Sequence, residues 1–332
     1  MSCSLTIADI GELGLLKKLQ PFCPREIVGD DAAILDIPEG KSLVVTTDVL
    51  VDGVHFSDQT TSAEDVGWRA AAANLSDIAA MGASPLGITV GLSLPGTVAV
   101  SWVEQLYQGL VNCLKPYQTP ILGGDICRSS VISLSITAIG AVSPTRAIHR
   151  SQAQPGQVIV VTGYHGSSRA GLELLLNPHL GENLSSKAKK ELILSHQRPQ
   201  ARLDVLKHLW PIVQNTTVTG MDSSDGLGDA LVQICQSSGV GAVIERQLIP
   251  RSPALMALVP PDQALEWALY GGEDFELVLC LSPKAAKQLV QQLGEGAAMI
   301  GEVTPGHQVA LIDAQGNLPN RVLTQSQSFQ HY

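Results

Sequence analysis

Residues 62–82 read SAEDVGWRAAAANLSDIAAMG, a segment that is apolar on nearly every side and therefore predicts a buried helix. Ser62 can serve as its N-cap, acidic residues occupy the first turn, and Gly82 provides a stop signal. Asn74 and Asp77 are three positions apart, so they share one helix face, and its other members are alanines rather than lysines. A buried carboxylate must be paired or bound to a metal. We therefore predict that Asp77 is either a metal ligand or the partner of an arginine in the core.

The segments around this helix predict a sheet. Residues 43–49 (LVVTTDV), 87–94 (GITVGLSL) and 131–142 (VISLSITAIGAV) are β-branched and partly alternating, as half-buried strands should be. A second helix is expected over 101–114. The N-terminal half is therefore sheet-rich, and the fold class is α/β (α+β).

A break in the pattern divides the chain. Residues 143–156 (SPTRAIHRSQAQPG) lose the apolar periodicity and contain two prolines and a glycine. The 332 residues also exceed the roughly 250–300 at which one core stops growing. We predict two domains, 1–150 and 151–332, the second being α/β. Its expected elements are strands at 157–162, 240–245 and 274–281, and helices near 167–177, 186–196, 199–209 and 226–238, with a polar, turn-rich tail from about 314.

Composition excludes several classes of protein. The formal charge of −10 argues against a nucleic-acid binder or a membrane-surface protein, because both need basic patches. No run of about 18 apolar residues suggests a membrane span, and the first 20 residues do not read as a signal peptide. The six cysteines are scattered without a C-x-x-C pair, which argues against zinc and disulfides and favours a reducing cytoplasm.

The stretch TGMDSSDGLGDAL, residues 219–231, concentrates three carboxylates ahead of an apolar run: Asp222, Asp225 and Asp229. Such acids can cap a helix, because they favour its positive end. Alternatively, carboxylates that converge with others can hold Mg²⁺, which proteins bind through a few carboxylates plus substrate phosphates. This stretch alone leaves both readings open.

Further acidic clusters are expected at element ends, where sites are usually assembled. Their sequences are GDDAAIL (29–35), TTDVLVDGVHF (46–56), NLSDIAAMGA (74–83), LGGDICR (122–128) and YGGEDFELVL (270–279). LGGDICR has the composition of a loop whose backbone approaches a phosphate closely, whereas the pairs Asp30–Asp31 and Glu273–Asp274 could equally belong to plain turns. The chain has no P-loop, no G-x-G-x-x-G fingerprint and no EF-hand, and His55 has no partner at H-E-x-x-H spacing.

Taken in order, these clusters resemble the thiamine-monophosphate kinase family, which belongs to the ATP-binding superfamily shared with aminoimidazole ribonucleotide synthetase. The resemblance extends from GDDAAIL to the terminal SFQHY and so covers nearly the whole chain. It implies an ATP-dependent transfer of the γ-phosphoryl group to thiamine monophosphate, giving thiamine diphosphate and ADP, with several Mg²⁺ ions. It also implies a homodimer formed through the N-terminal sheets and an active site between the domains.

The resemblance implies three sets of site residues and no general base. The family's metal ligands correspond to Asp31, Thr46, Thr47, Asp48, Asp77, Asp125, Asp222 and Asp225. Its nucleotide contacts correspond to Tyr107, Gly124, Asp125, Ser224 and Arg150, with Arg146 as the competing candidate for the last. Its substrate contacts correspond to His55, Glu273 and Phe329, where Phe329 stands at a position usually occupied by Trp or Tyr. Asp30 receives no role, and Asp229 is interpreted as a surface or capping acid.

The chemistry agrees with a kinase. A phosphate monoester has a second pKa near 6, so the acceptor is mostly ionised at neutral pH and needs no base. Bringing two anionic phosphates together requires positioning and neutralisation, which an acidic protein can supply only through cations. Two alternatives remain: a sister activity that activates an amide, formyl or selenide substrate, against which the contexts of His55 and Glu273 argue, and a non-catalytic Mg²⁺ or nucleotide-binding regulator.

Overall fold

The computed structural model describes residues 5–24, 27–28, 32–214 and 216–325. The chain divides into two compact units, one of residues 1–78 and 84–142 and the other of residues 79–83 and 143–332. The α/β class and the two-domain organisation expected from the sequence are confirmed. Within the described ranges, no helix has the length and apolar character needed to cross a membrane.

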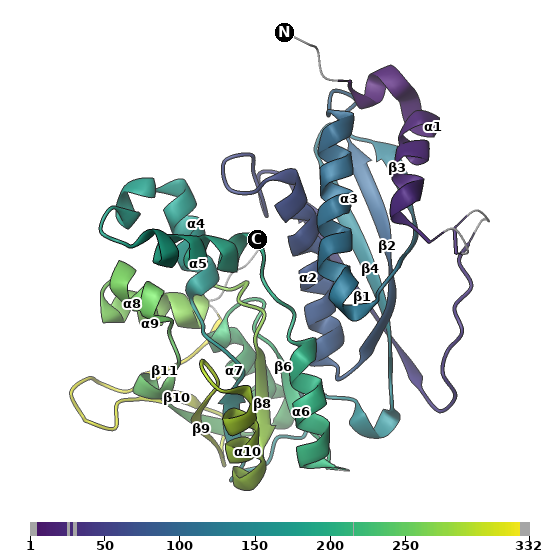
Figure 1. Cartoon of the computed structure of the whole chain (residues 1–332). Helices are drawn as coiled ribbons and strands as arrows, with labels where there is room; N and C mark the ends of the chain where they lie inside the picture. Colours follow the sequence, from purple (N-terminus) through teal and green to yellow (C-terminus); the bar gives the residue numbers. More distant parts are fainter. Residues whose placement is uncertain (1–4, 25–26, 29–31, 215, 326–332) are drawn as a thin grey trace. The chain divides into compact units, whose positions relative to one another are not determined.

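Unit 1 is a four-stranded sheet with helices on one face (Figure 1). The strand order is β1-β4-β2-β3, with β2 and β3 parallel and the other pairs antiparallel. The expected strands and helices of this half are present, with boundaries displaced by a few residues. Its elements are α1 (Ile7–Leu19), β1 (Ser42–Val51), α2 (Ala63–Ala80), β2 (Ser84–Leu94), α3 (Val100–Leu114), β3 (Ile121–Arg128) and β4 (Ser133–Val142), with short 3-10 turns at Gln20–Phe22 and Lys115–Tyr117.

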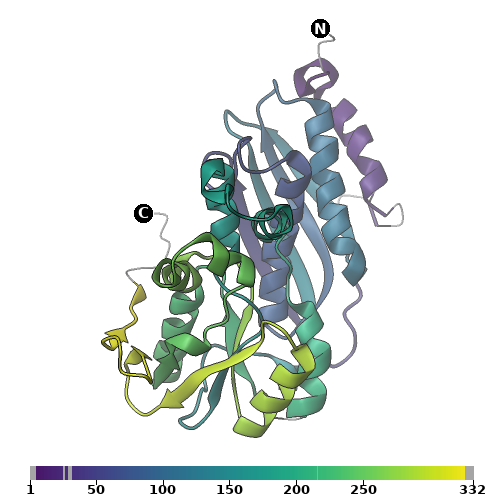
Figure 2. The same ribbon diagram turned by 60° about the vertical axis from the view of Figure 1, so that its left-hand side comes forward.

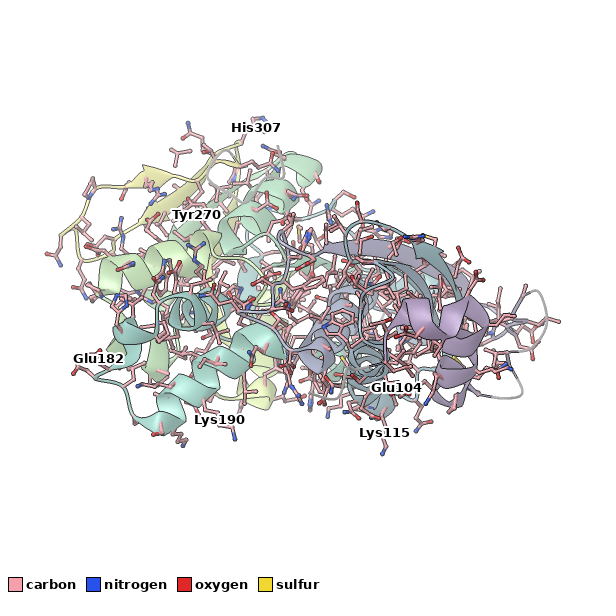
Figure 3. All side chains as sticks on the ribbon, turned by 90° about the horizontal axis from the view of Figure 1, so that it is seen from above. Glu104, Lys115, Glu182, Lys190, Tyr270 and His307 are labelled. Atoms are coloured by element: carbon pink, nitrogen blue, oxygen red, sulfur yellow. The ribbon has the colours of Figure 1, made fainter. Side chains whose placement is uncertain are left out.

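Two glycines allow α2 and α3 to pack in close contact. A Cβ added to Gly67 would lie 1.9 Å from the carbonyl oxygen of Leu106, and one added to Gly109 would lie 1.8 Å from that of Glu64. Both contacts are with backbone, so neither position can accept a side chain without separating the helices. On the outer side, α1 lies beside α3 (Figures 1 and 2), where Lys18 is 3.5 Å from Glu104, labelled in Figure 3.

One sequence interpretation is wrong. LGGDICR is not a loop but the greater part of β3, an edge strand that pairs with β2 from Ile121 to Arg128. The two glycines conceal the strand because Gly123 has a φ of 150° and the register with β2 shifts between Ile88 and Thr89. Such irregularities at sheet edges commonly direct side chains toward functional sites.

Unit 2 is built on a mixed seven-stranded sheet of order β11-β10-β7-β9-β5-β8-β6. Its strands are β5 (Val158–Val161), β6 (Thr219–Asp222), β7 (Gly241–Glu245), β8 (Leu277–Leu281), β9 (Ala298–Thr304), β10 (Val309–Ile312) and β11 (Arg321–Val322). Its helices are α4 (Ser167–Leu176), α5 (Ser186–Gln197), α6 (Leu203–Val213), α7 (Leu227–Ser238), α8 (Pro253–Leu258), α9 (Pro261–Tyr270) and α10 (Pro283–Leu293), and 3-10 turns lie at Pro144–Arg146, Pro178–Gly181 and Arg246–Leu248.

The sheet of unit 2 is buried on both faces. Leu227, Leu231 and Ile234 of α7 pack on one face together with α9, whereas α6 and α10 cover the other through a separate apolar cluster. Because β5 and β8 are buried on both faces, they read as continuous apolar runs rather than as alternating strands. The loops that follow β5 and β6 and the loop that precedes β8 lie at the same end of the strands, because β8 is antiparallel to both.

Candidate functional site

In unit 1, β1 and α2 bring three candidate metal ligands to the helix-covered face of the sheet. Thr46 and Asp48 are two residues apart, so both side chains lie on the face that α2 covers. The Thr46 hydroxyl donates a hydrogen bond to the Asp77 carboxylate of α2. The structure therefore supports a polar site at this position, in which the Asp77 carboxylate contacts the hydroxyl of Thr46.

Thr47 and Asp125 lie elsewhere on the sheet. The Thr47 hydroxyl is 2.9 Å from that of Thr137, on the face opposite to Thr46. Asp125 pairs in register with Gly91 on the same face as Thr47, but it belongs to β3, the edge strand opposite β1. Three strand spacings of roughly 4.8 Å separate the two edges by about 14 Å. Within one copy, Asp125 is therefore too distant to share an ion with Asp48.

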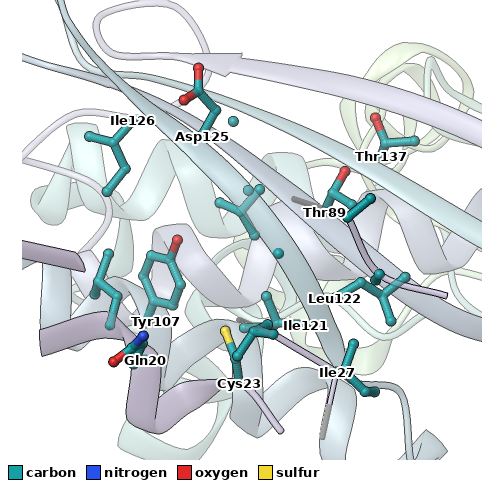
Figure 4. Close-up of a pocket in the computed structure, with 18 of the residues that line it drawn as sticks. Gln20, Cys23, Ile27, Thr89, Tyr107, Ile121, Leu122, Asp125, Ile126 and Thr137 are labelled. Carbon is teal, nitrogen blue, oxygen red and sulfur yellow. The ribbon is translucent and has the colours of Figure 1, made fainter. Parts of the chain in front are cut away.

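A pocket of about 780 Å³ lies at the β3 edge of unit 1 (Figure 4). It contains Tyr107, Gly124 and Asp125, all three of which the sequence assigned to the nucleotide. Its deeper wall is apolar and includes Leu19, Ile27, Ile121 and Leu122. An apolar wall with few polar groups is typical of pockets that bind small molecules.

Two features shape the wall of this pocket. Phe22 and Tyr107 stack in a tilted arrangement with ring centroids 5.7 Å apart, and burial raises the pKa of the Tyr107 hydroxyl, so it stays protonated as a hydrogen-bond donor. A Cβ on Gly124 would lie only 2.0 Å from the Val90 carbonyl oxygen, so a glycine is needed at this position.

His55 lies in the turn that follows β1. Its Nδ1 accepts a hydrogen bond from the Val51 amide at 3.1 Å, which leaves the proton of the neutral ring on Nε2. The buried Arg69 of α2 is 3.5 Å from the His55 carbonyl oxygen. Asp31, which the resemblance assigned to the metal ions, and Asp30, which received no role, lie outside the described residues.

In unit 2, the stretch around Asp222 forms the turn between β6 and α7. Asp222 ends β6 and is 2% exposed, and its carboxylate accepts a hydrogen bond from the Ser224 hydroxyl at 3.5 Å. Asp225 is exposed, and Gly226 has a φ of 104° that opens α7. The turn therefore carries one buried and one exposed carboxylate close together.

The segment that contains Glu273 packs against this turn. Its amide donates a hydrogen bond of 2.7 Å to the Ser224 carbonyl oxygen, so two sequence-predicted residues lie side by side. The backbone here is strained, because Glu273 and Phe275 have φ values of 58° and 52° in the left-handed region. Strain of this kind persists only where neighbouring contacts over-determine it, which is common at functional sites. His196 Nδ1 lies 3.8 Å from the Glu273 carboxylate.

Acids beside Glu273 form contacts that the sequence did not suggest. Asp274 accepts hydrogen bonds from the amides of Gly166 and Ser168, at 2.6 and 2.9 Å, at the start of α4. Burial raises the pKa of Asp274 to about 7, against the lowering effect of these amides. Glu276 is paired with Arg202, and burial raises its pKa while the guanidinium lowers it. The run of acids in GGEDFEL is the only sequence signal of these contacts. Their partners lie more than 70 residues away, so the local sequence does not identify them.

The two arginine candidates have different surroundings. Arg150 donates a 2.7 Å hydrogen bond to Gln233 of α7, whereas the Arg146 guanidinium lies 5.7 Å from the centroid of Trp210. Gln233 in turn donates to Asp229. Of the two interpretations of Asp229, the surface acid is wrong because the side chain is 6% exposed, whereas its place in the first turn of α7 agrees with a capping acid. Phe329 lies outside the described residues.

The residues present fit a hard cation. All candidate donors are carboxylate or hydroxyl oxygens, which Mg²⁺ prefers. Asn74, one turn before Asp77, is fully buried; its amide donates to the Ala70 carbonyl oxygen at 3.0 Å, while its Oδ1 has no hydrogen-bond partner among the described residues. A buried acceptor of this kind suits a position near a hydrated ion. Across the described ranges, no group of three or more His, Cys, Asp or Glu side chains forms a complete metal site by itself.

Comparison with known proteins identifies the class. The chain matches the model "AIR synthase related protein, N-terminal domain" over residues 29–142 and the corresponding C-terminal domain over residues 154–314. The chain therefore belongs to the AIR synthase related family. HypE of Escherichia coli, with 20% identity and a TM-score of 0.75 over 95% of this chain and 98% of its own, shares the fold.

Within that class, the chain belongs to the thiamine-monophosphate kinases. It is 50% identical to the thiamine-monophosphate kinase of Synechococcus elongatus over 98% of both chains, and 39% identical to that of Escherichia coli over 83% of both. The solved thiamine-monophosphate kinase of Stenotrophomonas maltophilia aligns with a TM-score of 0.77 and 33% identity, covering 89% of this chain and 93% of its own. AaThiL complexed with AMPPCP and TMP aligns with a TM-score of 0.70 and 31% identity, covering 97% of this chain and 99% of its own.

Proposed function

We propose that this chain transfers the γ-phosphoryl group of ATP to the phosphate of thiamine monophosphate and releases thiamine diphosphate and ADP. The observation that carries the proposal is the 50% identity to a thiamine-monophosphate kinase over 98% of both chains. AaThiL, solved with AMPPCP and TMP, supports the same pair of substrates. The sister activities and the regulator considered from the sequence have no comparable support.

The site contains no residue that has to act as a base. The acceptor is a phosphate monoester, which is mostly dianionic at neutral pH and can attack without losing a proton. His55 Nδ1 is occupied by the Val51 amide, so the ring presents Nε2–H, a hydrogen-bond donor, to its surroundings. His55 and Glu273 are accordingly assigned to substrate binding, together with Phe329 of the tail.

The remaining work is positioning and charge neutralisation. Mg²⁺, when bound, neutralises charge on the phosphate groups. In unit 1 the residues that would hold it are Asp31, Thr46, Thr47, Asp48, Asp77 and Asp125. Among these, the Thr46 hydroxyl already contacts the Asp77 carboxylate. In unit 2 they are Asp222 and Asp225. We assign several ions to these residues, because Asp48 and Asp125 lie on opposite edge strands of the sheet and cannot share one ion within a copy.

The nucleotide is assigned to the pocket at the edge of β3. Its apolar wall suits the base, and Tyr107 offers a hydroxyl within it. Gly124 and Asp125 also line this pocket, whereas Ser224 and Arg150 are assigned to the nucleotide by the sequence resemblance alone. Arg150 is favoured over Arg146, because Arg146 already packs on Trp210 whereas Arg150 makes a reversible polar contact with Gln233.

A homodimer formed through the N-terminal sheets fits two observations. Leu43, Val45 and Val49 line the face of β1 that the helices leave uncovered, and they are 48%, 62% and 49% exposed. Exposed apolar side chains in a row are typical of an interface between subunits. Asp125 lies on this same uncovered face, so an interface formed there places a candidate ligand beside the second copy. A reducing, cytoplasmic setting is proposed from Cys23, Cys113, Cys127, Cys235 and Cys280, all free thiols.

A product assay tests the proposal. The purified chain is incubated with ATP, Mg²⁺ and thiamine monophosphate, and thiamine compounds and adenine nucleotides are separated by chromatography. One ADP should form for each thiamine diphosphate. Thiamine without a phosphate is the control acceptor and should yield no product. Hydrolysis of ATP without thiamine diphosphate would refute the assignment.

A further inference from the structure

Three segments of unit 2 meet at the end of the seven-stranded sheet where the turn after Asp222 lies. They are residues 162–168 after β5, residues 223–226 after β6, and residues 272–276 before β8. In the sheet, β8 lies between β5 and β6, so the first two segments are not neighbours through the strand ladder. A side chain that joins them must reach past the beginning of β8. His165 makes this connection.

The hydrogen bonds of His165 define its tautomer. The ring is fully buried, with Nδ1 3.1 Å from the Gly163 carbonyl oxygen and Nε2 3.1 Å from the Ser223 hydroxyl. A carbonyl oxygen only accepts, so Nδ1 carries the proton and Nε2 accepts a hydrogen bond from Ser223. Burial lowers the pKa of His165 to about 4, and the nearby Arg202 charge acts in the same direction. The neutral ring is therefore the form present near neutral pH.

Ser223 stands between the two functional positions of the turn, directly after Asp222 and directly before Ser224. It is 1% exposed. Its amide donates to the Glu276 carbonyl oxygen at 2.9 Å, and its own carbonyl oxygen accepts from the Gly226 amide at 3.0 Å. The backbone of the turn is thus held from the β8 side and from within, while the Ser223 side chain holds it from the β5 side.

We propose that His165 is a positioning residue, which fixes Ser223 and thereby holds Asp222 and Asp225 in the arrangement that binds the metal ion. This inference rests on the proposed function, because that function assigns the two carboxylates to Mg²⁺. Loss of a hydrogen-bond partner that orients a ligand commonly costs about 10- to 100-fold in metal affinity. Here the effect passes through the backbone of the turn rather than through a direct bond to a carboxylate.

A merely structural role can be separated from a positioning role. Removing one partner of a buried hydrogen bond leaves the other unsatisfied, whereas replacing both by apolar groups can be nearly neutral for stability. His165→Leu alone should therefore lower both the thermal midpoint and metal affinity. The double variant His165→Leu with Ser223→Ala should recover part of the midpoint, because the Ser223 hydroxyl is no longer left unsatisfied whereas the Gly163 carbonyl oxygen still lacks its donor. It should not recover the affinity, since the connection is still absent. His165→Gln keeps an acceptor for Ser223 and is the conservative control.

The experiment titrates Mn²⁺, as the probe ion, into the full chain by calorimetry, and follows thermal unfolding in parallel. Asp222→Asn identifies the binding component that belongs to this turn. For that component we expect the Kd to rise about 10-fold in His165→Leu and in the double variant, and to stay within about 2-fold of wild type in His165→Gln. In turnover with ATP and thiamine monophosphate, the Mg²⁺ concentration for half-maximal rate should rise in the same order.

Several results would overturn the inference. They are a His165→Leu chain that binds Mn²⁺ like wild type, a double variant that recovers affinity together with stability, and a wild-type chain with no Mn²⁺ component sensitive to Asp222→Asn. A wild-type chain that binds Mn²⁺ at this turn but makes no thiamine diphosphate would refute the proposed function instead. In that case the calorimetric comparison of the variants still decides whether His165 positions the turn.

Discussion

Gly124→Ala perturbs the proposed nucleotide pocket at a point where the structure leaves no room. A Cβ at this position would lie 2.0 Å from the Val90 carbonyl oxygen on the paired strand β2. Carbon and oxygen atoms that are not bonded need about 3 Å or more. Because the obstructing atom is backbone, no side-chain rotation relieves the overlap, and β3 has to move by about 1 Å.

The magnitude follows from this displacement. Overpacking costs about 1–3 kcal/mol, and a rigid obstruction places the cost near the upper value. About 3 kcal/mol corresponds to a fall of roughly 6–12 °C in the thermal midpoint of a domain of this size. A shift of 1 Å in a positioning element can cost about 100-fold in rate. We therefore expect kcat/KM for ATP to fall by about 10- to 100-fold.

Gly91→Ala is the matched control. Gly91 lines the same pocket, but a Cβ there would meet Ser135 at 3.5 Å, an ordinary van der Waals distance. Both variants are compared by thermal unfolding and by kinetics at varied ATP with saturating thiamine monophosphate. If Gly124→Ala behaves like Gly91→Ala in both measurements, the close approach at Val90 is unimportant and the assignment of this pocket loses its support.

Three further predictions concern the proposed ligands and their neighbours. Asp77→Asn should abolish turnover at low millimolar Mg²⁺ while circular dichroism shows an intact fold, since an amide can still accept the Thr46 hydroxyl but brings no charge; near-normal activity would make Asp77 structural. The pKa of Asp274 is raised to about 7, so the folded state keeps this carboxyl protonated at pH values where the unfolded chain has lost the proton. The free energy of unfolding should therefore fall by about 4 kcal/mol as pH rises from about 4 to 7. Asp274→Asn should lack this part of the decline in urea unfolding at pH 5 and 8, and an unchanged pH dependence would contradict the raised pKa. Phe329→Ala should weaken thiamine monophosphate binding about 2- to 30-fold in calorimetry without changing the affinity for ATP, since ring stacking on a cation contributes roughly 0.5–2 kcal/mol. Phe329→Trp should keep the wild-type affinity for thiamine monophosphate. Equal affinity in wild type and Phe329→Ala would mean that Phe329 does not contact the substrate.

Local patterns predicted the secondary structure of unit 1 well. The alternation in 43–49 and the apolar helix at 62–82 correspond to β1 and α2 because each has a clear period. LGGDICR failed because its strand character comes from pairing with β2 rather than from its own residues. The helices α8, α9 and α10 lay in segments for which no prediction was made.

The candidate site was predictable only as a set of residue types. Thr46, Thr47 and Asp48 are adjacent in sequence, but alternation sends Thr47 to the other face of the sheet. The register that separates Asp125 from β1 involves three strand pairings and cannot be read from one segment. The same reason hides the bond between His165 and Ser223, which are 58 positions apart.

The fate of labelled phosphate distinguishes direct phosphoryl transfer to thiamine monophosphate from hydrolysis of ATP. The chain is incubated with Mg²⁺, thiamine monophosphate and ATP labelled in its γ-phosphate, and the products are resolved within one turnover. For direct transfer, the label should appear in the terminal phosphate of thiamine diphosphate, mole for mole with ADP. Label released as inorganic phosphate, with thiamine monophosphate left unchanged, would contradict it.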